Sequence, residues 1–171
     1  MLRILVATVL ALCSAAPVAR AQEMSKATQA LLTAERFGGL RLGLSEPETR
    51  KLLGKPAKQG KLVNQEADGT YVQEWHYPAQ GLDLVMTTGG KRNGAKSIAS
   101  ITAFAPNQRA TKQGITIGSP ESAVRKAYAA HVDRDTPAEP GVFVVGSIYG
   151  GIIFNFEKGK VSRIFFGAAA E

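Results

Sequence analysis

Histidines and acidic side chains are the residues of this chain whose types suit metal or acid–base chemistry. The sequence has two histidines, His76 and His131, and no H-E-x-x-H or similar spacing that would supply a zinc ion with ligands. Asp133 and Asp135 begin like a calcium loop, but the Gly and the distal Glu that complete such a loop are missing. The serine elbow G-x-S-x-G is also missing. We therefore predict no metal, no cofactor and no catalytic set.

Glu74 and Asp83 form the one acid–base pair that the strand pattern suggests. Alternation in Tyr71–Tyr77 and in Leu82–Met86 predicts two neighbouring strands, across which the two carboxylates would face each other. One carboxylate acting as the acid and the other as the base would suit a hydrolase. A hydrolase is our third hypothesis, behind two kinds of binding protein.

The basic segment from Gly89 to Ser97 nearly spells the phosphate-binding loop G-x-x-x-x-G-K-[ST]. Ala95 breaks the spacing, and the following residues alternate as in a strand, so no helix N-terminus would meet a phosphate. We predict instead a basic hairpin turn, whose Lys91, Arg92 and Lys96 can contact an acidic partner.

An aromatic row is the most suggestive cluster for binding. Tyr71, Trp75 and Tyr77 share one face of the predicted strand, and such side chains combine a large apolar area with a polar tip, as in protein-binding hot spots. Aromatic rows also fill cores beneath helices, and both interpretations stay open, as they do for Tyr149. The candidate interface is Tyr71, Trp75, Tyr77, Lys91, Arg92, Lys96 and Tyr149.

Residues 1–21 predict an export signal. Arg3 gives the positive start, residues 4–12 the apolar run, and Ala19-Arg20-Ala21 a cleavage site before Gln22. Cleavage would leave 150 of the 171 residues and would remove Cys13, the only cysteine. The mature chain would then have no disulfide and no thiolate metal site.

The charge balance limits the classes of partner. The net charge of the chain is +7, and it falls to +5 when Arg3 and Arg20 leave with the signal. This moderate positive balance favours acidic partners through long-range attraction, but it is too diffuse to predict a nucleic-acid partner. No later apolar run approaches the ~20 residues of a membrane-spanning helix. We predict a periplasmic or secreted protein without a transmembrane segment.

An internal repeat predicts the architecture. Gly39–Glu46 and Gly114–Glu121 resemble each other at a distance of 75 positions, and Arg50-Lys51 recurs as Arg125-Lys126. We predict an N-terminal helix within 22–38, a first α+β repeat at 39–105 and a second at 106–171 that forms one compact unit with the first. Each repeat would consist of a short strand, a helix capped by Ser45 or Ser119, and an antiparallel meander. The expected result is an α+β fold with a helix-on-sheet architecture.

The run G-[LI]-x-[LI]-G, the helix that ends in Leu52-Leu53-Gly54-Lys55-Pro56 and the meander resemble the BamE/SmpA-type unit. The beta-lactamase inhibitory proteins carry this kind of unit in tandem, and most of residues 39–166 are similar to that plan. The resemblance implies an exported α+β module that works by binding other proteins. The chain departs from both groups, because it lacks the lipid-anchor motif usual for BamE-type proteins and the disulfides common in the tandem inhibitors.

Two hypotheses on function lead. The first is an exported, non-catalytic protein-binding module, either an inhibitor or immunity-type protein or an envelope assembly protein, whose partner is another envelope or extracellular protein. The alternative is a periplasmic protein that binds a small ligand or an anion in a cavity between helices and sheet, lined by Trp75, Tyr77, Tyr128 and basic loop residues.

Overall fold

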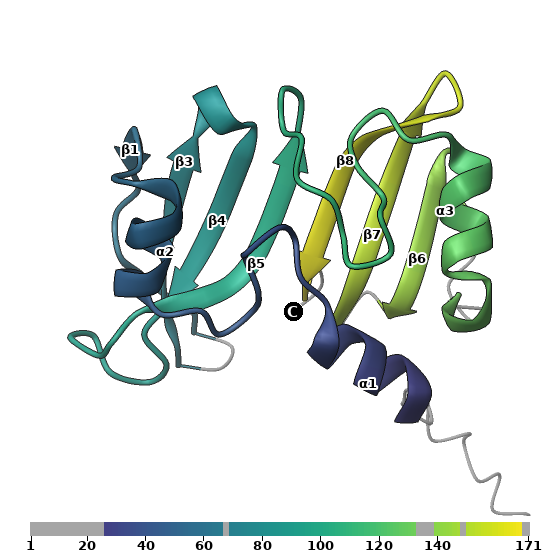
Figure 1. Cartoon of the computed structure of the whole chain (residues 1–171). Coiled ribbons are helices and arrows are strands. Elements are labelled where there is room, and N and C mark those ends of the chain that lie inside the picture. Colours follow the sequence, from purple (N-terminus) through teal and green to yellow (C-terminus); the bar gives the residue numbers. More distant parts are fainter. Residues whose placement is uncertain (1–25, 67–68, 133–138, 148–149, 169–171) are drawn as a thin grey trace, which may run out of the picture.

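The computed structural model describes residues 26–66, 69–132, 139–147 and 150–168. The predicted export signal, Asp133, Asp135 and Tyr149 lie outside these residues. Within them, three α-helices and one eight-stranded antiparallel sheet confirm the predicted α+β class (Figure 1). None of the described helices is long and apolar enough to cross a membrane.

The first half of the sheet is the expected meander, joined by two short strands at its outer edge. Its elements are α2 (Glu46–Leu53), β1 (Lys58–Gln59), β2 (Val63–Asn64), β3 (Tyr71–Tyr77), β4 (Leu82–Thr87) and β5 (Ser97–Phe104). β1 and β2 both pair with β3, so β3 is covered along its outer side.

The second half repeats the order of one helix and three strands. Its elements are α3 (Glu121–Ala127), β6 (Val142–Ser147), β7 (Gly150–Glu157) and β8 (Lys160–Gly167). The order across the whole sheet is β1-β3-β4-β5-β8-β7-β6, so both halves share one sheet and meet where β5 pairs with β8.

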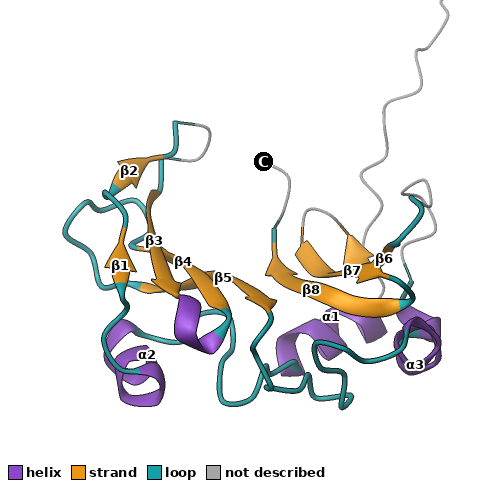
Figure 2. Cartoon of the chain, turned by 90° about the horizontal axis from the view of Figure 1, so that it is seen from above, coloured by secondary structure: helices purple, strands orange, loops and turns teal. Residues whose placement is uncertain are grey.

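The three helices lie on the same side of the sheet (Figure 2). The core fills the space between these helices and the sheet. Alternation along β4 shows how the strands meet this core, because Leu82, Leu84 and Met86 are buried and the residues between them are half-buried. On α2, Thr49 and Leu53 point inward, whereas the neighbouring Leu52 is 49% exposed. The inward stripe follows the helical spacing of four residues and therefore holds only one of the two leucines.

The two short helices begin differently. Glu48 accepts a hydrogen bond from the backbone N–H of Ser45, as the predicted capping box requires, and another from the Ser45 hydroxyl. These bonds, the hydroxyl one first, lower the pKa of Glu48. The expected cap at Ser119 is wrong. Its hydroxyl accepts from the backbone N–H of Thr116 at 3.0 Å, because Ser119 lies one position before the helix cap, Pro120.

Each glycine motif forms a loop where we expected a short strand, and this loop is bonded to the last strand of its own half. Gly43 and Gly118 have left-handed φ angles of 72° and 86°, which glycine adopts without steric cost. The N–H of Gly43 donates to the Ile98 carbonyl at 2.7 Å, and that of Gly118 donates to the Val161 carbonyl at 2.8 Å. The motif therefore positions each helix against its sheet.

Further details recur in both halves. A bulge follows Val85 in β4, and another follows Asn155 at the corresponding place in β7. Glu46 and Arg50 on α2 form an ion pair, as Glu121 and Arg125 do on α3. These parallels support the predicted internal duplication, which stays a prediction.

The seam between the halves has a symmetric register. Ile101 of β5 lies opposite Phe166 of β8, and Ala103 lies opposite Ile164. Ile101 pairs with Leu84 in the first half just as Ile164 pairs with Phe154 in the second, so Ile101 and Ile164 occupy corresponding positions. Ala103 and Phe166, each two residues further along its strand, also correspond. Exchanging the two halves therefore leaves the pairing of the seam unchanged.

Helix α1 (Lys26–Ala34) is attached to the second half by polar contacts. The Thr28 hydroxyl lies 3.1 Å from Nδ1 of His131. After the helix, the buried carboxylate of Glu35 accepts from the Tyr128 hydroxyl at 3.1 Å and from the backbone N–H of Lys112. Ala27 and Ala30 of this helix are exposed, because these polar contacts turn Thr28 inward.

Candidate functional site

The face of the sheet opposite the three helices is open in the described part of the chain (Figure 2). One row of paired residues crosses seven strands on this face. The strand register gives the row as Lys58, His76, Asp83, Thr102, Phe165, Ile153 and Val144. Paired residues of antiparallel strands point to the same face, so these side chains share one surface. The row itself is charged or polar on the first half of the sheet and apolar on the second.

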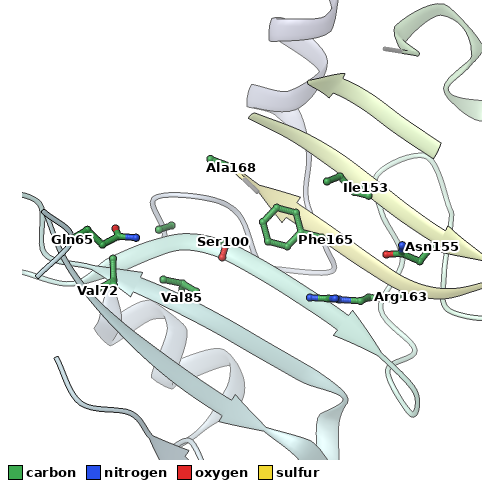
Figure 3. Close-up of a pocket in the computed structure, with 10 residues that line it drawn as sticks. Gln65, Val72, Val85, Ser100, Ile153, Asn155, Arg163, Phe165 and Ala168 are labelled. Carbon is green, nitrogen blue, oxygen red and sulfur yellow. The ribbon is translucent and has the colours of Figure 1, made fainter. Parts of the chain in front are cut away.

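A groove of about 390 Å³ lies on this open face where β5 meets β8 (Figure 3). Its apolar lining comes from both halves, with Val72 and Val85 on one side and Ile153 and Phe165 on the other. Its polar lining includes Gln65, Ser100, Asn155 and Arg163. The groove therefore offers aromatic and aliphatic contact area bordered by hydrogen-bonding groups.

The charged part of the row is organised by His76. Its Nδ1 lies 2.8 Å from a carboxylate oxygen of Asp83, and its Nε2 lies 3.5 Å from one of Glu74. The register places Asp83 opposite His76 and Glu74 opposite Val85, so the two carboxylates are not directly opposed as the hydrolase hypothesis expected. Both ring nitrogens of His76 face carboxylates. In the part of the chain that the structure describes, no three side chains of His, Cys, Asp or Glu group so as to hold a metal ion.

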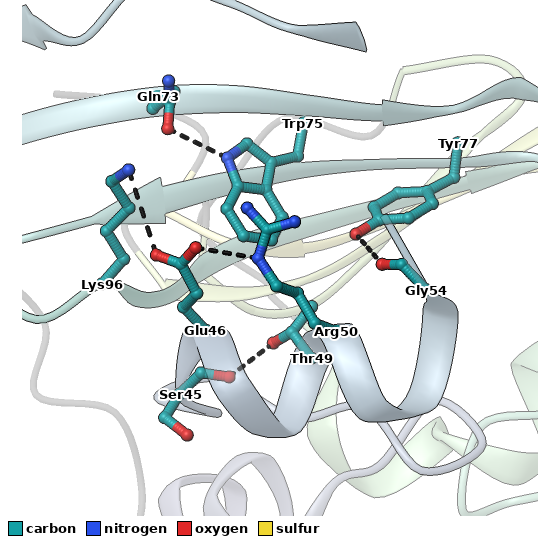
Figure 4. A network of polar contacts seen from close by, with 9 residues as sticks. All are labelled: Ser45, Glu46, Thr49, Arg50, Gly54, Gln73, Trp75, Tyr77 and Lys96. Atoms are coloured by element: carbon teal, nitrogen blue, oxygen red, sulfur yellow. Dashed lines mark hydrogen bonds and ion pairs between the residues drawn. The ribbon is translucent and has the colours of Figure 1, made fainter. Parts of the chain in front are cut away.

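The aromatic row lies beneath α2, so the candidate interface needs correction at two of its residues. Trp75 and Tyr77 are 0% and 3% exposed, because α2 covers their face of β3 (Figure 4). The Trp75 indole N–H donates to Oε1 of Gln73 at 3.0 Å, and the Tyr77 hydroxyl donates to the Gly54 carbonyl at 3.2 Å. Burial raises the pKa of Tyr77. These two side chains belong to the core and are not available to a partner.

The remaining candidate residues lie in different surroundings. Tyr71, at the start of β3, is half-buried, and Lys91 and Arg92 are exposed in the turn between β4 and β5. Lys96 is half-buried, and its ammonium group lies 3.9 Å from the Glu46 carboxylate (Figure 4). Lys91 and Arg92 thus remain open to a partner, whereas Lys96 is held close to α2.

The expected ligand cavity between helices and sheet is not formed by its predicted residues. Trp75 and Tyr77 pack beneath α2, while Tyr128 follows α3 and its ring centre lies 5.3 Å from that of Phe154. Burial is the main cause of a strongly raised pKa of Tyr128. The three rings are core residues of two separate halves.

The open-face residues Ile153, Arg163 and Phe165 were missing from the candidate site. Their signal is present in the sequence, since Phe165 lies between Ile164 and Phe166 in β8 and must point away from the face that those two residues share. Such alternation does not say which face the helices cover. The structure supplies that information.

In comparisons with known proteins, the chain matches no family model, no curated protein and no solved structure. The functional conclusions therefore rest on the residues of this chain.

Proposed function

We propose that this chain is an exported, non-catalytic protein-binding module whose contact surface is the open face of the sheet. The observation that carries the proposal is the row from Lys58 to Val144, which continues across the seam and is covered by none of the described helices. Helices cover the other face of the same sheet. An uncovered face with a groove at its centre is available to another molecule.

The composition of the open face suits a protein partner. Phe165 and Ile153 stand at the groove, and Arg163 and Asn155 border it (Figure 3). Protein interfaces place aromatic and aliphatic side chains at their centre, with polar groups and arginine around them. The polar half of the row, with His76 between its carboxylates, would fix the orientation of the partner.

The resemblance to the BamE/SmpA-type unit and to the tandem beta-lactamase inhibitory proteins supports the same function class. It implies a module that binds other proteins, as an inhibitor, as an immunity-type protein or in envelope assembly. The positive charge of the chain favours an acidic envelope or extracellular partner. Deletion phenotypes separate these roles, because a barrier defect indicates assembly and sensitivity to one enzyme or toxin indicates inhibition.

The test is a capture experiment with envelope extract at several salt concentrations. Arg163→Glu and Ile153→Asp change the open face, and Ala130→Asp is the matched control, because Ala130 is exposed outside that face. We expect a partner whose recovery falls by about tenfold or more with each open-face variant and is unchanged with the control. Circular dichroism checks that each variant is folded. Equal recovery by all variants, or no specific partner at any salt concentration, would refute the proposal.

A further inference from the structure

A second cavity lies on the other side of the sheet, between α1 and the start of β7. Its volume is about 370 Å³, within the range of ~300–1,000 Å³ that is typical of small-molecule sites. Leu32 of α1, Leu42 of the first glycine motif and Phe166 of β8 provide apolar lining. We call this cavity the α1 pocket. It is separate from the groove on the open face, with which it shares no lining residue.

Two arginines from different segments line the α1 pocket. Nη1 of Arg36 donates to the carbonyl oxygens of Thr33 and Glu35, at 3.1 and 2.6 Å, and Nη1 of Arg41 donates to that of Leu42 at 3.3 Å. Among the described residues, neither guanidinium has an acidic side chain within ion-pair distance. The other N–H groups of both guanidinium groups therefore lack a carboxylate partner in the described chain.

Glu35 also lines the pocket, but its carboxylate is already occupied. One oxygen accepts from the backbone N–H groups of Arg36 and Lys112, and the other accepts from the Tyr128 hydroxyl. The pocket is thus lined by two guanidinium groups and one carboxylate whose oxygens already accept hydrogen bonds from other groups, which leaves a net positive charge at an apolar cavity. An anionic head group on an apolar chain matches this arrangement, since guanidinium groups bind carboxylates through paired hydrogen bonds.

We propose that the α1 pocket binds an aliphatic chain that carries a single carboxylate head group. The chain lies against Leu32, Leu42 and Phe166, and Arg36 and Arg41 hold the carboxylate. This site is independent of the proposed protein-binding face. Failure of one proposal leaves the other unchanged.

Gly150 provides a way to fill the pocket without disturbing the fold. It precedes the buried Ile152 by two positions on β7, so its missing side chain would point to the helix side, into the pocket. A Cβ built on Gly150 meets no atom within 4 Å, and the residue does not have a left-handed φ. Gly150→Leu should therefore block the pocket. Gly90→Leu is the matched control, because Gly90 is an exposed turn glycine with the same open surroundings.

The experiment is isothermal titration of the whole chain with decanoate, with shorter fatty acids and with decanol. We expect saturable decanoate binding that strengthens about fourfold, at most, for each added methylene group. Gly150→Leu should abolish it, Arg36→Gln and Arg41→Gln should each weaken it about tenfold, and Gly90→Leu should leave it unchanged. Decanol should bind less tightly than decanoate and should bind both arginine variants as it binds the parent.

Three results would overturn the proposal. The first is the absence of decanoate binding below the concentration at which decanoate forms micelles. The second is unchanged binding by a folded Gly150→Leu variant, or, if that variant does not fold, by the two arginine variants. The third is equal affinity for decanol and decanoate, which would remove the role of the arginines.

Discussion

The guanidinium carbon of Arg50 lies 4.5 Å from the centre of the Trp75 ring, while Nε of the same arginine lies 2.9 Å from the Glu46 carboxylate. Arg125 repeats this arrangement over the ring of Phe143, at 5.2 Å. In each half, an arginine of the helix thus covers an aromatic ring of the first strand of the meander. Both halves thus have an arginine at this place, but the ring is that of tryptophan in the first half and that of phenylalanine in the second.

The first prediction compares these two arginines. Arg50→Ala should lower the free energy of unfolding by about 1 kcal/mol, and Arg125→Ala by about half as much, because tryptophan binds cations better than phenylalanine does. Arg125 is also more exposed, with 52% of its side chain accessible against 35% for Arg50, so water screens its interactions more. Urea denaturation of both variants measures the difference, and a larger loss for Arg125→Ala would contradict the prediction.

The second prediction concerns Tyr128 and the buried carboxylate of Glu35. Tyr128→Phe removes one donor from Glu35 and should cost about 1–3 kcal/mol of stability at neutral pH. The parent should lose stability as the pH rises above about 10, because the raised pKa of Tyr128 keeps its proton in the folded state while the unfolded chain releases it. The variant should lose less over this range. Denaturation between pH 8 and 11 measures both effects. Tyr71→Phe, which changes a half-buried tyrosine, is the control. A stability profile of Tyr128→Phe that falls as steeply as that of the parent would count against this explanation.

The third prediction concerns the start of α2. The Ser45 hydroxyl, followed by the Ser45 backbone N–H, lowers the pKa of Glu48, so the ionised carboxylate favours the folded state. This contribution is present above the ordinary pKa of glutamate, about 4.3, and is lost as the pH falls through the lower value of the folded state. Glu48→Gln should therefore flatten the acid side of the stability profile. Thermal unfolding between pH 2 and 6 tests this, and an unchanged acid slope would argue against it.

The fourth prediction concerns the glycine that ends β8 at the seam. A Cβ on Gly167 would lie 2.6 Å from the Cβ of Ser100, and the φ of Gly167 is 149°. Gly167→Ala should lower stability by about 1–3 kcal/mol. Adding Ser100→Gly should recover part of the loss, because it removes the atom in closest contact. A double-mutant cycle measures this coupling, and strictly additive effects would show that the contact does not matter.

The strands were predictable because their alternation is strong. β3 has the predicted bounds, and Leu82, Leu84 and Met86, which alternate in the second predicted strand, are all buried. The capping box of α2 was also predictable, since it depends on two residues three positions apart. These features are local in the sequence.

Features that depend on contacts far along the chain were not predictable. The pairing of β5 with β8 joins Ile101 to Phe166 and follows from no local pattern. The burial of Trp75 depends on which side of the sheet α2 occupies, and alternation alone gives two equivalent sides. Similarly, the rotation of α1 about its own axis follows from the contact of Thr28 with His131. The spacing of apolar residues along that helix does not predict this contact.

The symmetric register of the seam has a consequence for assembly. Without the seam, β5 and β8 would each be an edge strand with unpaired backbone groups, and such edges promote association between molecules. Because Ile101 and Ala103 pair with Phe166 and Ile164 in an exchangeable way, the β5 edge of one molecule also fits the β8 edge of a second. A chain whose seam opens is therefore expected to form domain-swapped dimers, in which each half completes its sheet with the half of a neighbour.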